Sequence, residues 1–160
     1  MPNPSNLLVP KTNILLTIVV LLALIVLSFY GMYGNTFFFN KAENYIFPLL
    51  TSTHFLYLYV LWFKITEREY PDVIMKNIEY IMYGIVLVYG YEFFSTYTIL
   101  STHNEFQDHV IPNTFMPMGI LIVTLQTILV CLSIWSFAIR KIRIGKYDFD
   151  YLNNHLDAWE

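Results

Sequence analysis

Four long stretches of this 160-residue chain are almost free of charge. The stretches 12–40, 45–63 and 110–139 contain no Asp, Glu, Lys or Arg, and the stretch 80–102 contains only Glu92. A helix needs about 20 mainly apolar residues to cross the hydrocarbon core of a bilayer. Charged residues make up 13% of the chain, against about 25% in an average soluble domain. The sequence therefore predicts four membrane-spanning helices, over residues 13–33, 45–63, 77–100 and 115–139.

The basic residues are unevenly distributed between the segments that connect these spans. If the N-terminus is cytoplasmic, the inner segments hold eight of the nine Lys and Arg residues, and the outer segments hold only Lys41. Cytoplasmic segments of membrane proteins carry an excess of Lys and Arg. We therefore predict that both termini and the tail 140–160 are cytoplasmic, and that the loops 34–44 and 101–114 face the outside.

Short connections between long helices favour antiparallel neighbours. The predicted fold is an all-α integral membrane protein with one domain, residues 1–160, arranged as an up-and-down bundle of four transmembrane helices. The lipid bilayer is its first predicted partner. We expect Met1–Pro10, with its three prolines, to be extended, and Cys131 to be a small buried hydrophobic residue. Topology accounts for the basic residues, so nothing here predicts nucleic-acid binding.

Glu92 is the only charged residue between positions 80 and 102. A carboxylate at that depth costs about 2.5–3.5 kcal/mol on insertion scales, so it normally faces a partner, a cavity or a site. His54 lies nine residues from the outer end of its span and Glu92 eight residues from the outer end of its own, while Gln126 is slightly deeper. Similar depths allow side chains from three helices to meet. We predict an intramembrane polar network of His54, Glu92, Thr96 and Gln126.

Helical spacing extends this group toward the outer end of the third span. Residues Tyr89, Glu92, Thr96, Ile99 and His103 follow steps of three and four, so they share one helix face. One interpretation is an interhelical hydrogen-bond network in which a neutral or histidine-paired Glu92 holds the bundle together. The other is a metal, quinone or proton site that opens to the outside.

The loop that follows this stripe is dense in groups that bind metals. His103, Glu105, Asp108 and His109 are potential donors, although their spacing matches no compact zinc signature. Imidazole suits copper, zinc, iron or nickel, whereas carboxylates suit harder ions. We predict Glu92, His103 and His109 as metal ligands; a solvated polar loop is the alternative.

Glu92-x3-Thr96-x12-His109 has the spacing of a known copper motif, in which an acidic or amide residue is followed by two histidines. The segment 53–55, Thr-His-Phe, also has a counterpart among archaeal proteins that carry the motif. In these features the chain resembles the C subunit of copper-dependent membrane monooxygenases, which oxidise ammonia or methane. The resemblance implies copper as cofactor and ligand roles for Glu92 and His109. Thr96 stands where the family has its first histidine, and a hydroxyl is a poor copper ligand, so the implied site is degenerate unless His103 substitutes.

The chain has no complete catalytic constellation and no room for a separate catalytic domain outside the spans. We therefore predict no catalytic residues. The predicted function is a small membrane subunit of a larger, redox-active membrane complex, with a structural or cofactor-supporting role and other membrane subunits as partners. One alternative is a divergent C-type subunit of a copper-dependent membrane monooxygenase. Another is a small proton or solute conduit along the stripe through Glu92.

Overall fold

The computed structural model describes residues 4–102 and 111–147. Its long helices are α1 (Pro4–Leu27), α2 (Ile46–Glu67), α3 (Val73–Ser101) and α4 (Phe115–Arg143). Each of the four contains a stretch that is long and apolar enough to cross a membrane. The prediction of an all-α bundle with four helices of transmembrane length is confirmed.

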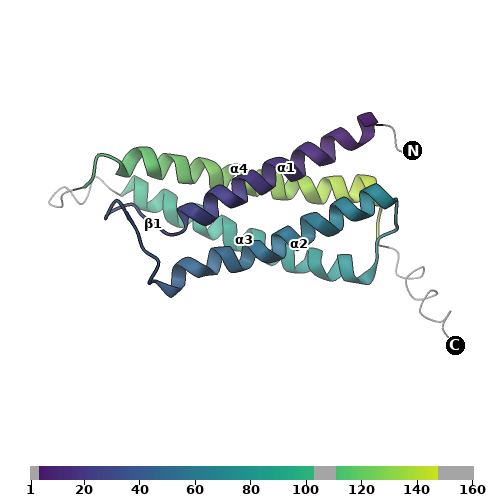
Figure 1. The fold of residues 1–160 in the computed structure, drawn as a ribbon, viewed down its shortest axis with the longest axis horizontal. Coiled ribbons are helices and arrows are strands. Elements are labelled where there is room, and N and C mark those ends of the chain that lie inside the picture. The colour runs from purple at the N-terminus through teal and green to yellow at the C-terminus, as the bar shows by residue number, and fades with distance from the viewer. Residues whose placement is uncertain (1–3, 103–110, 148–160) are drawn as a thin grey trace.

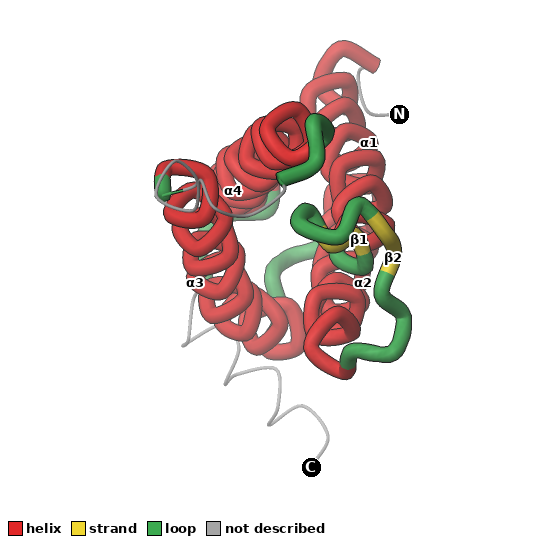
Figure 2. The backbone as a smooth tube through the Cα atoms, turned by 90° about the vertical axis from the view of Figure 1, so that its left-hand side faces the viewer, coloured by secondary structure: helices red, strands yellow, loops and turns green. Residues whose placement is uncertain are grey.

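The four helices run alternately up and down along the long axis of the molecule (Figure 1). Both α1 and α3 pack against α2 and α4, so α1 and α3 lie diagonally opposite each other, as the end-on view shows (Figure 2). The start of α1, the α2–α3 turn and the end of α4 share one end, which holds eight of the nine basic residues. We call this the basic end and the opposite one the hairpin end. The charge bias is thus a property of the folded bundle, while its orientation in a membrane stays a prediction.

One face of each helix forms the core. Along α4 most buried positions follow steps of three and four: Phe115, Gly119, Ile122, Gln126, Leu129, Ser133, Ser136 and Arg140; Leu132 and Ile139 are buried beside them. Gly119 allows a close approach to α3, because an added Cβ would lie 2.3 Å from Leu100 Cδ2. Only 28–33% of the residues in the most apolar window of each helix are buried. Most of the surface of each helix therefore points out of the bundle.

The chain leaves α1 earlier than the first predicted span ends. The helix stops at Leu27, six residues before position 33. A short hairpin follows, in which β1 (Tyr30–Gly31) pairs antiparallel with β2 (Thr36–Phe37). Asn35 turns the chain with a φ of 47°, a left-handed conformation that asparagine tolerates better than most residues. The one-turn helix η1 (Ala42–Tyr45) then leads directly into α2.

At the basic end the helices extend beyond the predicted spans. The region expected to be extended is helical from Pro4, a first-turn position where a missing N–H is tolerated. Asp72 caps α3 by accepting a 2.8 Å hydrogen bond from the Met75 amide, so α3 begins four residues before position 77. Helix α4 continues to Arg143, whereas residues 148–160 of the predicted tail lie outside the described residues. Cys131 is exposed on α4, contrary to expectation.

Candidate functional site

A cavity of about 290 Å³ lies between the helices at the hairpin end. Residues from α1, the hairpin, η1, α2, α3 and α4 all contribute to its wall. Its acidic and polar side chains, other than Tyr30, are those of Ser28, Glu43, Asn44, Glu92, Thr96 and Gln126. We call it the acidic cavity, because two carboxylates and no Lys or Arg from the described residues line it. It is a polar space within a bundle whose exterior is mainly apolar.

Three of the predicted network residues meet in this wall. Thr96 lies one turn beyond Glu92 on α3, and its hydroxyl donates to the Glu92 backbone carbonyl at 2.9 Å. Gln126 of α4 donates from Nε2 to Thr96 Oγ1 at 3.3 Å. Thr96 and Gln126 are buried, whereas Glu92 is exposed, and its carboxylate has no hydrogen-bond or ion-pair partner among the described residues. The structure thus brings these three residues to one cavity, where no described residue pairs with the Glu92 carboxylate.

His54 is not part of that group. It is fully buried on α2, where Nδ1 lies 3.3 Å from the Tyr89 hydroxyl and the two rings stack at 5.9 Å. Its Nε2 is buried without a partner in the described structure. Residue counts from the span ends predicted that His54 lies level with Glu92, but a similar depth does not determine which residue on that face of α3 contacts α2. That residue is Tyr89, one turn from Glu92 toward the basic end.

The predicted metal ligands are only partly described. Glu92 lines the acidic cavity, whereas His103 and His109 lie outside the described residues. Within residues 4–102 and 111–147, no group of three or more His, Cys, Asp or Glu side chains could hold a metal ion. The copper site inferred by resemblance therefore stays a prediction, and elemental analysis of the purified protein tests it.

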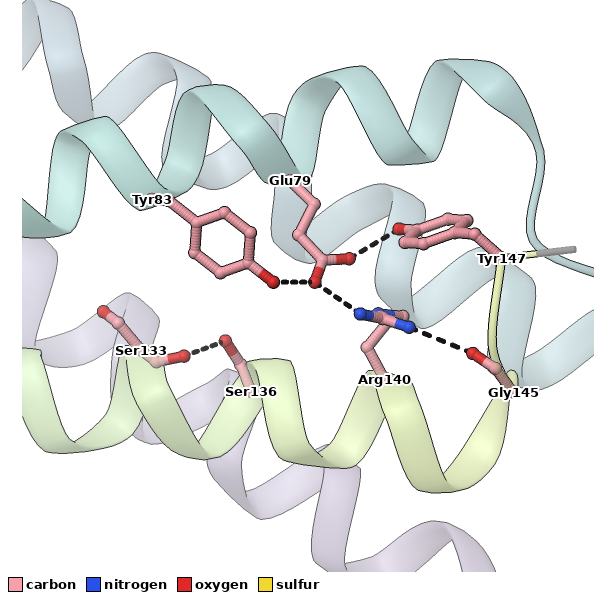
Figure 3. Close-up of polar contacts among 7 residues, drawn as sticks. All are labelled: Glu79, Tyr83, Ser133, Ser136, Arg140, Gly145 and Tyr147. Carbon is pink, nitrogen blue, oxygen red and sulfur yellow. Dashed lines mark hydrogen bonds and ion pairs between the residues drawn. The ribbon is translucent and has the colours of Figure 1, made fainter. Parts of the chain in front are cut away.

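The basic end contains a charged cluster that the sequence interpretation missed (Figure 3). Glu79 of α3 is 1% exposed and accepts three hydrogen bonds. Tyr83 and Arg140 each donate to Oε1 at 2.6 Å, and Tyr147 donates to Oε2 at 2.5 Å. Arg140 also donates to the Gly145 carbonyl at 3.0 Å. We call these side chains the Glu79 cluster; it joins α3, α4 and the segment after α4.

Tyr147 completes this cluster from outside the helices. Its ring lies 4.5 Å from the Arg140 guanidinium carbon, which suits a cation–π contact. Burial, followed by the hydrogen bond to Glu79 and the charge of Glu79, raises the pKa of Tyr147 far above its usual value. Tyr147 therefore remains a protonated donor to the carboxylate at any physiological pH.

A second ionic group fixes the α2–α3 turn. The Lys64 side chain is 9% exposed, and its ammonium group lies 2.6 Å from Glu69 Oε2 and 2.9 Å from Asp72 Oδ2. Burial opposes ionisation of Asp72, but hydrogen bonds from Lys64 and the Met75 amide outweigh it and lower the pKa of Asp72. Here, as in the Glu79 cluster, every charge has an opposite charge in contact.

A sequence signal for Glu79 did exist. Met75, Glu79 and Met82 follow steps of four and three, so Glu79 stands on the face that carries the apolar core residues of α3. Arg140 likewise follows Ser133 and Ser136 along the inward face of α4. The nearly charge-free stretch 80–102 begins one residue after Glu79, and Arg140 was interpreted only as a marker of topology. The same spacing of three and four residues, continued one turn further along each helix, indicates both residues.

Comparisons with protein-family models, curated proteins and solved structures give no match.

Proposed function

We propose that this protein is a small, non-catalytic subunit of a larger membrane assembly, inserted with both termini in the cytoplasm. The observation that carries the proposal is a difference between the outward faces of α1 and α3. A helix that meets only lipid needs nothing except apolar side chains, whereas a helix that meets another protein also carries small residues and hydrogen-bonding groups.

The outward face of α1 is entirely aliphatic. Its large exposed side chains between positions 15 and 26 are Leu15, Leu16, Val19, Leu22 and Val26, each 53–60% exposed. No hydroxyl, amide or aromatic group interrupts this face between those positions. Its chemistry is that of a surface in contact with lipid tails.

The outward face of α3 has a different character. Tyr80, Tyr83, Tyr91 and Tyr97 are 42–69% exposed on it. Tyr80 and Tyr97 lie toward the helix ends, where tyrosine suits the membrane interface. Tyr91 lies ten residues before Ser101, about 15 Å along the helix axis, so in the proposed membrane-inserted form it lies within the hydrocarbon region. Its hydroxyl has no described partner, so a hydrogen bond to a neighbouring protein would remove the penalty of an unpaired polar group in lipid.

Two glycines flank this part of α3. A Cβ added at Gly84 or Gly90 would meet no atom within 4 Å, so neither glycine is needed for packing inside the bundle. Glycine within a helix destabilises it by about 1 kcal/mol relative to alanine. On a membrane helix, small residues let a partner helix approach closely. Together with Tyr91, the glycines support an interface on α3.

In-membrane photocrosslinking tests the proposal in the organism's own membrane. A photoreactive phenylalanine analogue at Tyr91 is expected to give one discrete adduct with another membrane protein. The matched control is the same analogue at Val19 on α1, which is expected to crosslink only lipid. Identical adduct patterns at the two positions, or lipid adducts alone at Tyr91, would contradict the subunit role.

A further inference from the structure

The segment between α1 and α2 is rich in aromatic residues and poor in charge. Residues 28–45, which contain the hairpin and η1, include seven Phe or Tyr residues, and their only charged residues are Lys41 and Glu43. In the end-on view the hairpin lies on the α1 and α2 side of the bundle (Figure 2). A connection surrounded by water gains nothing from exposed aromatic rings, because apolar surface is disfavoured in water. The composition of this segment therefore indicates a partner that covers it.

Four of these rings form one connected group on the surface. The Phe39 ring centroid lies 6.3 Å from that of Phe37 and 5.2 Å from that of Phe29, and the Phe29 centroid lies 5.0 Å from that of Tyr45. Phe37, Phe39 and Tyr45 are 49–60% exposed. We call these four side chains the aromatic patch. It is an apolar surface that the described part of the bundle leaves largely uncovered.

The backbone beneath the aromatic patch is hydrogen-bonded within the protein. The Phe38 amide donates to the Phe29 carbonyl at 2.7 Å. The Asn44 side chain donates to the Phe38 carbonyl at 2.7 Å, and the Tyr45 hydroxyl donates to the Phe39 carbonyl at 2.9 Å. In water such carbonyls bond to solvent, whereas backbone groups next to lipid must be satisfied by the protein itself. Two side chains thus supply what this non-helical segment needs beside lipid.

The adjoining helices place the hairpin at the boundary of the hydrocarbon region. The candidate membrane span of α1, Val9–Leu27, has 19 residues, and its length of about 28 Å matches a hydrocarbon core of about 30 Å. On the other side of the hairpin, the charge-free stretch 45–63 has a similar length and starts at Tyr45, the last residue of η1. In a bilayer the aromatic patch therefore lies where both helices leave the hydrocarbon, a level at which aromatic residues are enriched.

The polar atoms of the aromatic patch favour lipid over protein as its partner. A protein interface carries about one hydrogen bond per 100–200 Å². Here the Phe38 and Phe39 carbonyls and the Tyr45 hydroxyl are already engaged with each other or with Asn44. What remains for a partner is mainly the apolar surface of the rings, which acyl chains can cover without any hydrogen bond.

We propose that the aromatic patch is a lipid anchor, embedded at the headgroup–acyl boundary of the leaflet at the hairpin end. The rings contact the upper part of the acyl chains. Lys41, whose ammonium lies 5.3 Å from the centroid of the Phe38 ring, supplies a positive charge for the lipid phosphates. Anchors of this kind restrict the depth and tilt of the helices to which they are attached. The inference rests on the membrane insertion in the proposed function, and adds to it the depth of the hairpin.

Spin-label depth measurements on the full-length protein in phosphatidylcholine nanodiscs test the anchor. Cys131 is the only cysteine, so Cys131→Ser gives a background in which one label is placed at a time. Labels at Phe39→Cys, Val19→Cys and Lys146→Cys report on the aromatic patch, the outward face of α1 and the basic end. Power saturation compares collisions of each label with oxygen, which concentrates in hydrocarbon, and with a water-soluble nickel chelate.

The label at Val19 is expected to collide mainly with oxygen, and the label at Lys146 mainly with the nickel chelate. The label at Phe39 should collide with both, at a depth of about 5–10 Å in the headgroup–acyl boundary. Phe37→Cys places a label on a second ring of the aromatic patch and should give the same depth. This second position decides the result if Phe39→Cys does not fold.

Three results at the aromatic patch would overturn the anchor. A label with the accessibility of Lys146 lies in water, a label with that of Val19 lies deep in the hydrocarbon, and a label protected from both reagents is covered by protein. Any of these, with Val19 still in hydrocarbon, leaves the membrane insertion and the subunit role standing. Water accessibility at Val19 would instead contradict the insertion, and with it the proposed function.

Discussion

Helix α3 carries two glutamates about 20 Å apart along its axis, and they have opposite surroundings. Glu79 is 1% exposed and accepts hydrogen bonds from Tyr83, Arg140 and Tyr147. Glu92 is exposed to a cavity and has no partner among the described residues. A fully satisfied buried charge holds elements together, whereas an unsatisfied one is available to a ligand. The comparison therefore assigns a structural role to Glu79 at the basic end, whereas Glu92 at the hairpin end makes no structural contact through its carboxylate among the described residues.

The largest expected effect tests the structural half of this comparison. Glu79→Ala leaves Arg140 as a buried, unpaired cation, so we expect the free energy of unfolding to fall by about 3–5 kcal/mol. Equilibrium unfolding in mixed micelles, followed by circular dichroism, measures it. The control is Lys141→Ala, which removes an exposed cation next to Arg140 and should change stability by less than about 0.5 kcal/mol.

A double variant distinguishes the stability contributed by the ion pair from the cost of leaving one buried charge unpaired. Glu79→Leu combined with Arg140→Met should be less destabilised than either single variant, because no unpaired charge remains in the core. If the single and double variants lose the same stability, the cluster contributes by packing and the comparison with Glu92 loses its basis.

Tyr147→Phe isolates one hydrogen bond of the Glu79 cluster. The variant keeps the ring over Arg140 and removes only the hydroxyl that donates to Glu79. We expect a loss of about 1.5 kcal/mol, toward the low end for bonds to charged groups because Tyr147 is half-buried. Tyr59→Phe, on the exposed face of α2, is the control and should have no measurable effect in the same unfolding assay. If Tyr147→Phe and Tyr59→Phe are equally stable, the Tyr147 hydroxyl does not contribute to the stability of the Glu79 cluster.

The Lys64–Asp72 contact is intermediate between the two glutamates, since it is paired but half-open to solvent. The pKa of Asp72 is lower in the folded chain than in the unfolded one. Its contribution to stability is therefore present above the ordinary aspartate pKa of about 3.9 and is lost as pH falls through the lower folded value. We expect this contribution to be under about 1 kcal/mol, because the Asp72 side chain is 42% exposed.

Unfolding free energies measured from pH 7 down to pH 2 (a range set by the aspartate pKa of about 3.9) check this expectation. Asp72→Asn keeps a capping side chain for α3 and removes the charge, so its stability should fall less than that of the wild type across the acid limb. Parallel pH curves for the two proteins would show that the contact with Lys64 is not coupled to folding.

The sequence predicted the bundle well, because hydrophobic length and charge bias determine helix number and alternation directly. It predicted helix ends less well. Helix α1 ends at Leu27 because the chain then enters a hairpin, whose strands are held together in part by aromatic contacts such as Tyr30–Phe37. Glu92 was found because it is isolated in apolar sequence. Glu79 was missed because it lies near a helix end, where a charge is ordinary.

The partners of these residues were harder to predict than their positions. His54 was predicted to lie at the depth of Glu92, but its described contact on α3 is Tyr89. The rotation of a helix about its axis depends on packing along its whole length, which the sequence does not show. Gln126 does contact Thr96, because the predicted polar face of α3 that carries Thr96 packs against the inward face of α4. Periodicity thus predicts which side chains share a helix face, and only the folded bundle shows which side chains are in contact.

The smallest expected effect on stability is also the sharpest test of the comparison. Glu92→Gln and Glu79→Gln make the same chemical change, a loss of negative charge at nearly constant shape, at two positions of one helix. Glu79→Gln should be clearly destabilising, because it leaves the Arg140 charge unpaired in a buried site. Glu92→Gln should leave the unfolding free energy within about 0.5 kcal/mol of wild type or raise it, because it removes a carboxylate that has no partner among the described residues. The same micelle unfolding assay measures both. A large loss of stability in Glu92→Gln would mean that the carboxylate has a structural partner in the folded protein, and the contrast between Glu92 and Glu79 would then disappear.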